Sequence, residues 1–344
     1  MLPSATLWCR PFSSARPSSA PRISNGIAER KKTQKWDDNS NINSKQLMTR
    51  KKMMGFNLGG SQLLMSNVNR RSTTIAGVGR GGSVTELDDN VRKFLQVALW
   101  ATEAVYIVWL FLLPYAPGDP VWAISSETIN SLIGLSLNFF FVLPFLNAVG
   151  VHLLEGPVLH PMSEGLFNFV IAWTLLFAPL LYTDRRRNSY KGSLDVLWGF
   201  QMFLTNTFLI PYMALRLNKG DETRTKRKTS PLGSVMINGA SVVGLTGAAV
   251  CLLSVLWAIY GRADGDFGNI SERLDFLVNY LGSERLAYAF IWDIVLYTIF
   301  QPWLIGENLQ NIRKDSVKIV SYLRFVPVVG LVAYCICLNV EEDS

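Results

Sequence analysis

The chain has 344 residues, 49% of them hydrophobic, and a net charge of +7 that gathers in the N-terminal region and in two loops. A protein that binds nucleic acid would place its basic residues on one face of a soluble domain, so this distribution argues against a nucleic-acid partner. Mean hydropathy is +0.22 although the first 90 residues are polar, which means that the rest of the chain is strongly apolar.

The N-terminal segment has the composition of an organellar targeting sequence. Residues 1–28 hold six Ser, three Arg and four Pro, and no acidic residue precedes Glu29. A leader rich in Ser and Arg and free of acid is typical of a transit peptide. Its Ser and Pro content favours the plastid, with the mitochondrion and a cytosolic tail as alternatives. Residues 29–90 stay polar and cannot bury a core, so residues 1–90 are predicted to be a transit peptide and a disordered polar segment.

Residues 91–344 are predicted to form an integral membrane domain built only of helices. A helix that crosses a bilayer needs roughly 20 predominantly apolar residues, because lipid offers the backbone no hydrogen-bond partner. Seven windows meet this requirement, at residues 94–115, 129–151, 165–182, 196–215, 235–260, 286–305 and 317–338. The predicted fold is an all-α, multi-pass transmembrane bundle of about seven spans, preceded by the disordered leader and surrounded by the lipid bilayer.

Lys and Arg in short loops indicate how such a bundle is oriented. With the N-terminus inside, the inside loops hold 11 basic residues and the outside loops hold 7. This places the N-terminus and loop 216–230 in the stroma of a plastid and the acidic C-terminal tail on the other side. The run Arg185–Arg187 is the exception, because seven spans put it outside.

A shorter amphipathic segment lies between the fifth and sixth windows. Apolar residues recur with helical spacing from Ile270 to Leu281, and Asn269 stands three residues before Glu272, as in a capping box. We expect a helix here that either lies on the membrane surface or packs on neighbouring loops.

Three charged residues fall well inside the predicted spans, away from the first and last residues of each window. Glu103 and Asp293 lie near the centres of their spans, and Arg324 lies five or six residues into the last one. A charge at mid-bilayer costs roughly 2.5–3.5 kcal/mol, so each is a candidate functional residue. The favoured interpretation is structural pairing of an acid with Arg324, and the alternative is a role in binding a proton, ion or ligand. Asn138 on the second span and Asn206 on the fourth complete the candidate intramembrane polar site, although helix packing is the favoured interpretation of both.

The sequence has no recognisable catalytic, cofactor-binding or metal-binding motif. The two histidines, His152 and His160, stand eight residues apart across two prolines, which is no known ligand spacing. We therefore expect no enzyme and no cofactor. The favoured function is a non-catalytic plastid (chloroplast) membrane protein, in the thylakoid or inner envelope, that assists assembly or maintenance of a membrane complex whose subunits are its partners. The alternatives are a transporter or channel that uses the intramembrane carboxylates, and a mitochondrial inner-membrane location.

Overall fold

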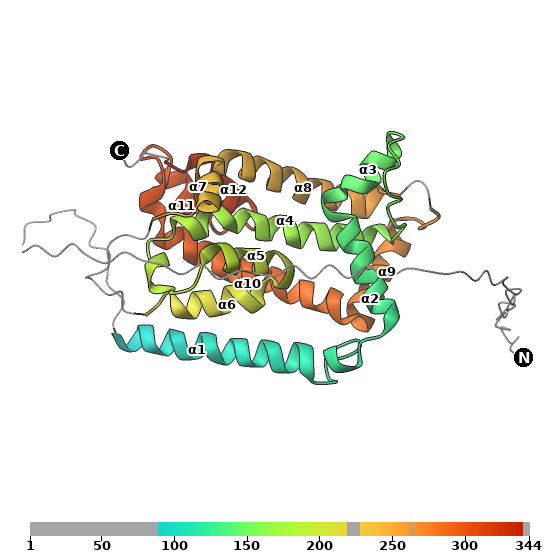
Figure 1. The fold of residues 1–344 in the computed structure, drawn as a ribbon, viewed down its shortest axis with the longest axis horizontal. Coiled ribbons are helices and arrows are strands. Elements are labelled where there is room, and N and C mark those ends of the chain that lie inside the picture. Colours follow the sequence, from blue (N-terminus) through green and yellow to red (C-terminus); the bar gives the residue numbers. More distant parts are fainter. Residues whose placement is uncertain (1–88, 219–227, 263–264, 340–344) are drawn as a thin grey trace, which may run out of the picture. The chain divides into compact units, whose positions relative to one another are not determined.

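In the computed structural model, residues 89–218, 228–262 and 265–339 are described, and every named element in them is a helix (Figure 1). One isolated antiparallel bridge joins Ile312 to Leu338. The all-helical fold is therefore confirmed for these residues. The predicted leader, residues 1–90, lies outside them except for its last two residues, which begin the first helix.

Four helices in the described residues are long and apolar enough to cross a bilayer. They are α1 (Asp89–Ile107) with its π-helical continuation η1 (Val108–Leu112), α4 (Pro161–Thr183), α8 (Ala240–Tyr260) and α10 (Arg285–Glu307). At 1.5 Å per residue they are roughly 30–36 Å long, which matches the hydrocarbon core. The helices are therefore compatible with a membrane protein.

These four helices run between two ends of one bundle (Figure 1). We call one the basic end, which comprises residues 89–93, 184–193, 216–218, 228–230, 308–318 and 338–339. The acidic end comprises residues 113–126, 149–160, 261–262 and 265–285. Contacts define the basic end, since Arg92 donates to the Leu217 carbonyl and Asn308 donates to Asp184. At the acidic end, Arg285 donates to the carbonyls of Leu113 and Gly118.

The second predicted span is bent and stays near the acidic end. It comprises α2 (Ser126–Leu137), η3 (Phe139–Phe141) and α3 (Val142–Ala148), with a bend of 41°. Phe140 and Phe141 both have positive φ, which interrupts the helix. Thr128 contacts Glu284 at the start of this segment, and Asn138 contacts Glu164 in the first turn of α4.

The fourth predicted span is a helical hairpin rather than a crossing. Its arms are α5 (Leu194–Leu204) and α6 (Asn206–Leu215), and the chain reverses at Thr205, where φ is 41°. Asp195 bonds Tyr182 and Ser230, and Arg216 bonds Asp184. The first arm, α5, therefore begins at the basic end, and the second arm, α6, returns to it. The prediction of one span was wrong because two apolar half-helices have the same hydropathy as one long helix.

The seventh predicted span also folds back. Its arms are α11 (Val317–Leu323) and α12 (Val329–Cys337), separated by Pro327 and by Val328 at φ 63°. The bridge between Ile312 and Leu338 holds the two ends of this hairpin together. Seven spans are therefore not confirmed, and the described chain both begins and ends at the basic end.

The remaining helices cover the ends of the bundle. They are α7 (Pro231–Asn238) at the basic end, α9 (Ile270–Ser283) at the acidic end, and the short 3-10 turns η2 (Val121–Ala123), η4 (Arg187–Ser189) and η5 (Leu309–Asn311). The predicted amphipathic helix is confirmed as α9, with both hydrogen bonds of the capping box between Asn269 and Glu272. Its apolar residues Ile270, Leu274 and Val278 are exposed rather than packed on protein.

The centre of the bundle is α4, which is the most enclosed of the four long helices. Helix α8 packs closely on α4 through a glycine, because a side chain at Gly247 would collide with Leu176. On the same helix, Gly244 gives the same close approach to Cys335 of α12. Small residues that let backbones approach are typical of helix packing in membranes.

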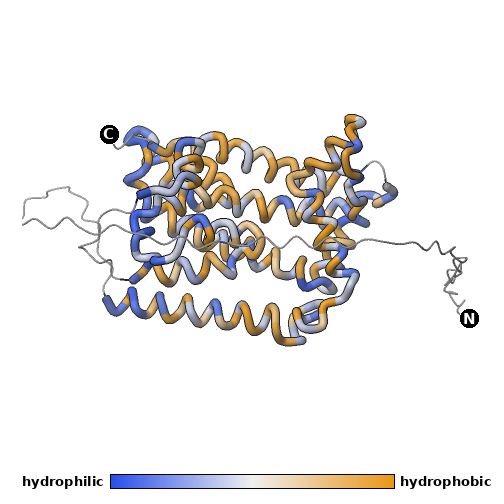
Figure 2. Tube along the Cα trace, viewed as in Figure 1, coloured by the Kyte–Doolittle hydropathy of each residue, from blue (hydrophilic) through white to orange (hydrophobic). Residues whose placement is uncertain are grey.

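Hydrophilic residues gather at the ends of the bundle, whereas the helices between them are mostly hydrophobic (Figure 2). The described Lys and Arg residues of the basic end number eleven: Arg92, Lys93, Arg185, Arg186, Arg187, Lys191, Arg216, Lys228, Arg313, Lys314 and Lys318. Those at the acidic end are Arg262, Arg273 and Arg285. The run Arg185–Arg187, predicted to lie opposite loop 216–230, lies beside its described residues because α5 and α6 turn back between them.

Candidate functional site

Asp293 lies about midway along α10 and is 1% exposed. Its Oδ1 accepts from the hydroxyl of Tyr106 on α1, at 3.0 Å, and from the side-chain amide of Asn206, at 2.7 Å. The Thr205 hydroxyl and the main-chain N–H of Asn206 also bond the carboxylate. Asp293 therefore has four donors, all from protein, and no cation among the described residues bonds it.

These donors mark the tip of the α5–α6 hairpin. Asn206 is the first residue of α6, and the first N–H groups of a helix have no partner within it and carry partial positive charge. Asp293 thus caps α6 from another helix and offsets this charge. A carboxylate held in this way is explained as a structural brace, without a bound ion.

Gln301, two turns further along α10, braces the tip of the second hairpin. Its Nε2 donates to the carbonyls of Arg324, at 2.9 Å, and Val326, at 2.8 Å. Its Oε1 accepts from the Val328 N–H and from the indole N–H of Trp173 on α4, both at 3.1 Å. All four hydrogen-bonding positions of the amide are used. One helix therefore holds both hairpin tips.

Arg324 and Glu103 do not join Asp293. The Arg324 guanidinium lies against Gly306 and, 4.6 Å away, over the ring of Phe325. Gly306 is 13 residues beyond Asp293, about 20 Å along the helix, so the predicted pairing with Arg324 is wrong. Glu103 is buried on α1, one turn before Tyr106, and its Oε2 has no hydrogen-bond partner in the described chain.

Asn138 belongs to a different cluster at the acidic end. It donates to Glu164 Oε1, at 2.5 Å, and Arg262 forms a buried ion pair with the same carboxylate, at 2.6 Å. Trp257 donates to the other carboxylate oxygen, at 2.7 Å. Of the five residues predicted to form an intramembrane polar site, the structure brings together Asn206 and Asp293.

A second buried ion pair lies at the basic end. Arg216 donates to both oxygens of Asp184, each at 2.7 Å, and Tyr212 and Asn308 also donate to this carboxylate. Burial alone would raise the pKa of Asp184, but the Arg216 charge and these hydrogen bonds outweigh burial and hold that pKa below its ordinary value. Glu307 extends the cluster, with oxygens 3.1 Å from Arg216 and 3.2 Å from Arg186.

Replacing Asp184 with Asn is expected to lower the free energy of unfolding by up to about 3–5 kcal/mol, because it removes the principal counter-charge of the buried Arg216 and leaves only the partly exposed Glu307. Because the native pKa of Asp184 is lowered, its contribution is complete above about pH 4 and is lost as pH falls through the native value. Thermal unfolding in detergent should show the same deficit at pH 6 and pH 8. Asp315→Asn, an exposed acid at the same end, is the control and should be neutral.

His160 is the N-cap of α4. Its Nδ1 accepts from the Met162 N–H at 3.2 Å, and its ring stacks on Phe276 of α9 with centroids 3.5 Å apart. Burial and the nearby Arg273 charge lower the pKa of His160 to about 4. In the described residues no group of three or more His, Cys, Asp or Glu side chains is placed to hold a metal ion.

Stability is expected to fall when the pH drops from 7 to 5, and His160 should account for part of this. Its pKa is about 4 in the folded chain and about 6.5 when unfolded, so the unfolded state binds more protons in that window. His160→Asn retains an N-cap acceptor and should flatten the dependence of the melting temperature on pH. His152→Asn, which changes an exposed histidine, should leave it unchanged; equal slopes in all three proteins would contradict this assignment.

Comparison with protein-family models, with curated proteins and with solved structures found no match to this chain.

Proposed function

We propose that this chain is a non-catalytic, multi-pass plastid membrane protein, of the thylakoid or inner envelope, that assists assembly or maintenance of a membrane complex. The observation that carries the proposal is the way Asp293 is satisfied. A transport site keeps polar groups available to a solute, whereas the four donors to Asp293 all come from protein and close the tip of the α5–α6 hairpin.

Embedding in a bilayer accounts for the outer surface. Large apolar side chains on α1, such as Phe94, Val97 and Val105, are more than 60% exposed. The same is true of Phe203 near the tip of the α5–α6 hairpin. In this setting the two hairpins are re-entrant segments, and α9 lies at the interface with its exposed apolar face toward lipid. Such apolar surface is also available to the transmembrane helices of partner subunits.

The test compares a line that lacks the protein with one that carries a tagged copy. On native gels of solubilised plastid membranes, the tagged chain should migrate with a larger complex, and that complex should accumulate less in its absence. A chain that migrates alone, in a line whose membrane complexes are all of normal abundance, would contradict an assembly role.

Transport is the second candidate, and Glu103 favours it. This residue is buried, and its Oε2 has no hydrogen-bond partner in the described residues. Unsatisfied polar atoms at this depth are costly and are expected where a proton or solute binds. If Glu103→Gln accumulates normally but does not restore a line that lacks the protein, while the native complexes are intact, transport becomes the better explanation.

A further inference from the structure

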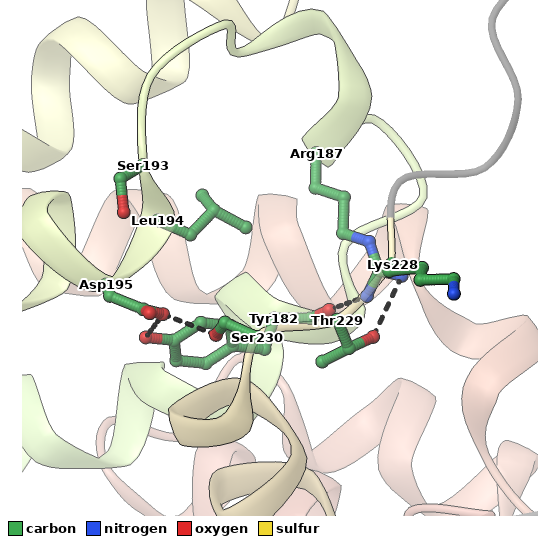
Figure 3. A pocket seen from close by; sticks show the side chains of 8 residues that line it. All are labelled: Tyr182, Arg187, Ser193, Leu194, Asp195, Lys228, Thr229 and Ser230. Atoms are coloured by element: carbon green, nitrogen blue, oxygen red, sulfur yellow. Dashed lines mark hydrogen bonds between the residues drawn. The ribbon is translucent and has the colours of Figure 1, made fainter. Parts of the chain in front are cut away.

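A small polar cavity opens at the basic end, beside the ion-pair cluster but separate from it (Figure 3). Its volume is about 50 Å³. The lining residues come from the end of α4, from the loop and first turn of α5, and from the chain that enters α7: Tyr182, Arg187, Ser193, Leu194, Asp195, Lys228, Thr229 and Ser230. A single water needs roughly 10–15 Å³ on this measure, so the space suits one small polar group.

The hydrogen bonds already made around the cavity leave mainly donors free. Ser193 Oγ accepts from the Val196 N–H, and Thr229 Oγ1 accepts from Arg187 Nη2, so each hydroxyl retains its proton for a ligand. Arg187 donates a second N–H to the Tyr182 carbonyl. Its guanidinium has five N–H groups in all, so further donors are left for a ligand. Lys228 adds an ammonium group at the rim.

Asp195 is the one acid in the lining, and it faces other partners. Its Oδ1 accepts from the Tyr182 hydroxyl, at 2.9 Å, and from the Ser230 hydroxyl, at 2.5 Å. Figure 3 shows these three side chains grouped on one side and Arg187 with Thr229 on the other. Two cations against one acid leave the cavity net positive, within an end that already carries eleven described basic residues.

We propose that this cavity binds a single phosphate group, with Arg187 as the principal contact and the Ser193 and Thr229 hydroxyls as further donors. Arginine binds phosphate oxygens through paired N–H groups, and hydroxyl donors complete such sites. Because the cavity lies at the basic end of a bundle with exposed apolar sides, an anionic lipid headgroup and a soluble phosphate are both sources of such a group. The inference is independent of the proposed function and holds for an assembly factor and a transporter alike.

The experiment measures binding to the purified full chain in detergent by thermal stabilisation. The probes are inorganic phosphate, phosphatidic acid and diacylglycerol, the last two of which differ only in the phosphate. Wild type should bind phosphatidic acid at least tenfold more tightly than Arg187→Gln, because a charge-assisted, forked contact is lost. Asp195→Asn keeps the acceptor for Tyr182 and Ser230 but removes the repelling charge, so it should tighten binding severalfold.

The matched control is Lys314→Gln, which removes one charge from the same end but lies outside the cavity. It should leave binding within about twofold of wild type, since exposed charges are screened beyond roughly 10 Å. Binding of phosphatidic acid alone identifies a lipid as the source, and equal binding of inorganic phosphate identifies a soluble one; both support the site. Equal binding of diacylglycerol, no binding of any probe, or equal losses in Arg187→Gln and Lys314→Gln would overturn it.

Discussion

When protease is added to the stromal side of intact membranes, a tag fused after Ser344 is expected to be digested together with loop 219–227. Asn311 bonds Asn339 just before the C-terminus, and Arg92 near the start of α1 bonds Leu217, so both described ends of the chain lie at the basic end. Eleven described basic residues there against three at the other end indicate, by the positive-inside rule, that the basic end faces the inside, which is the stroma under the proposed plastid location.

The control for this experiment is a cleavage site inserted at 263–264, between α8 and α9 at the acidic end. It should be cut only after the membranes are opened with detergent. A C-terminal tag that stays protected while loop 219–227 is cut would require an odd number of crossings. That result would contradict the folding back of the α11–α12 hairpin and restore the seventh predicted span as a crossing.

Replacing Asp293 or Gln301 with Leu is expected to deplete the protein severely. Asp293→Leu leaves the donors of Tyr106, Thr205 and Asn206 without an acceptor inside the bundle. Gln301→Leu leaves the Arg324 carbonyl and the N–H groups of Val328 and Trp173 without this partner, while the Val326 carbonyl keeps the Gly330 N–H. Each buried group left unpaired costs roughly 1–3 kcal/mol, and domains are stable by only about 5–15 kcal/mol.

Membrane abundance and melting temperature in detergent measure this effect. Thr298→Val is the control, because Thr298 lies on the same helix but is exposed and bonds only its own backbone at Ile294. Adding Arg324→Gln to Asp293→Asn should give no recovery, since the two side chains do not meet. Recovery in the double variant would reinstate the Asp293–Arg324 pair, and normal abundance with lost function would favour transport.

Hydropathy was sufficient to predict an all-helical bundle and to locate every apolar helix, because length and composition determine which segments can be buried in lipid. It could not distinguish a crossing from a hairpin. The reversal at Thr205 depends on a positive φ in a residue that ordinarily avoids it, and on a cap supplied by Asp293 from another helix. The run Arg185–Arg187 was a signal for the hairpin. Any arrangement in which 196–215 crosses the membrane puts this basic run on the opposite side from the basic loop 216–230.

The candidate site shows the same limit. Residue type and depth identified Asp293 and Asn206, which meet, but also Arg324 and Asn138, which lie elsewhere. Tyr106 and Gln301 were missed because a tyrosine or a glutamine in an apolar helix is ordinary on its own. A polar residue two turns from Asp293 on the same helix was the available signal for Gln301.

The order in which the segments of the chain enter the membrane affects when the α5–α6 hairpin can insert. Asn206 and its acceptor Asp293 are 87 residues apart, so a chain that enters the membrane from its N-terminus delivers the hairpin well before the helix that caps it. Before α10 is in place, the backbone groups of the turn at Thr205 lack their partner. They cannot be left unpaired in the hydrocarbon of a bilayer. We therefore expect the hairpin to stay at the membrane surface, or bound to an insertion factor, and to insert only when α10 does. The same late helix then receives the α11–α12 hairpin, so biogenesis of this protein is completed from its C-terminal half.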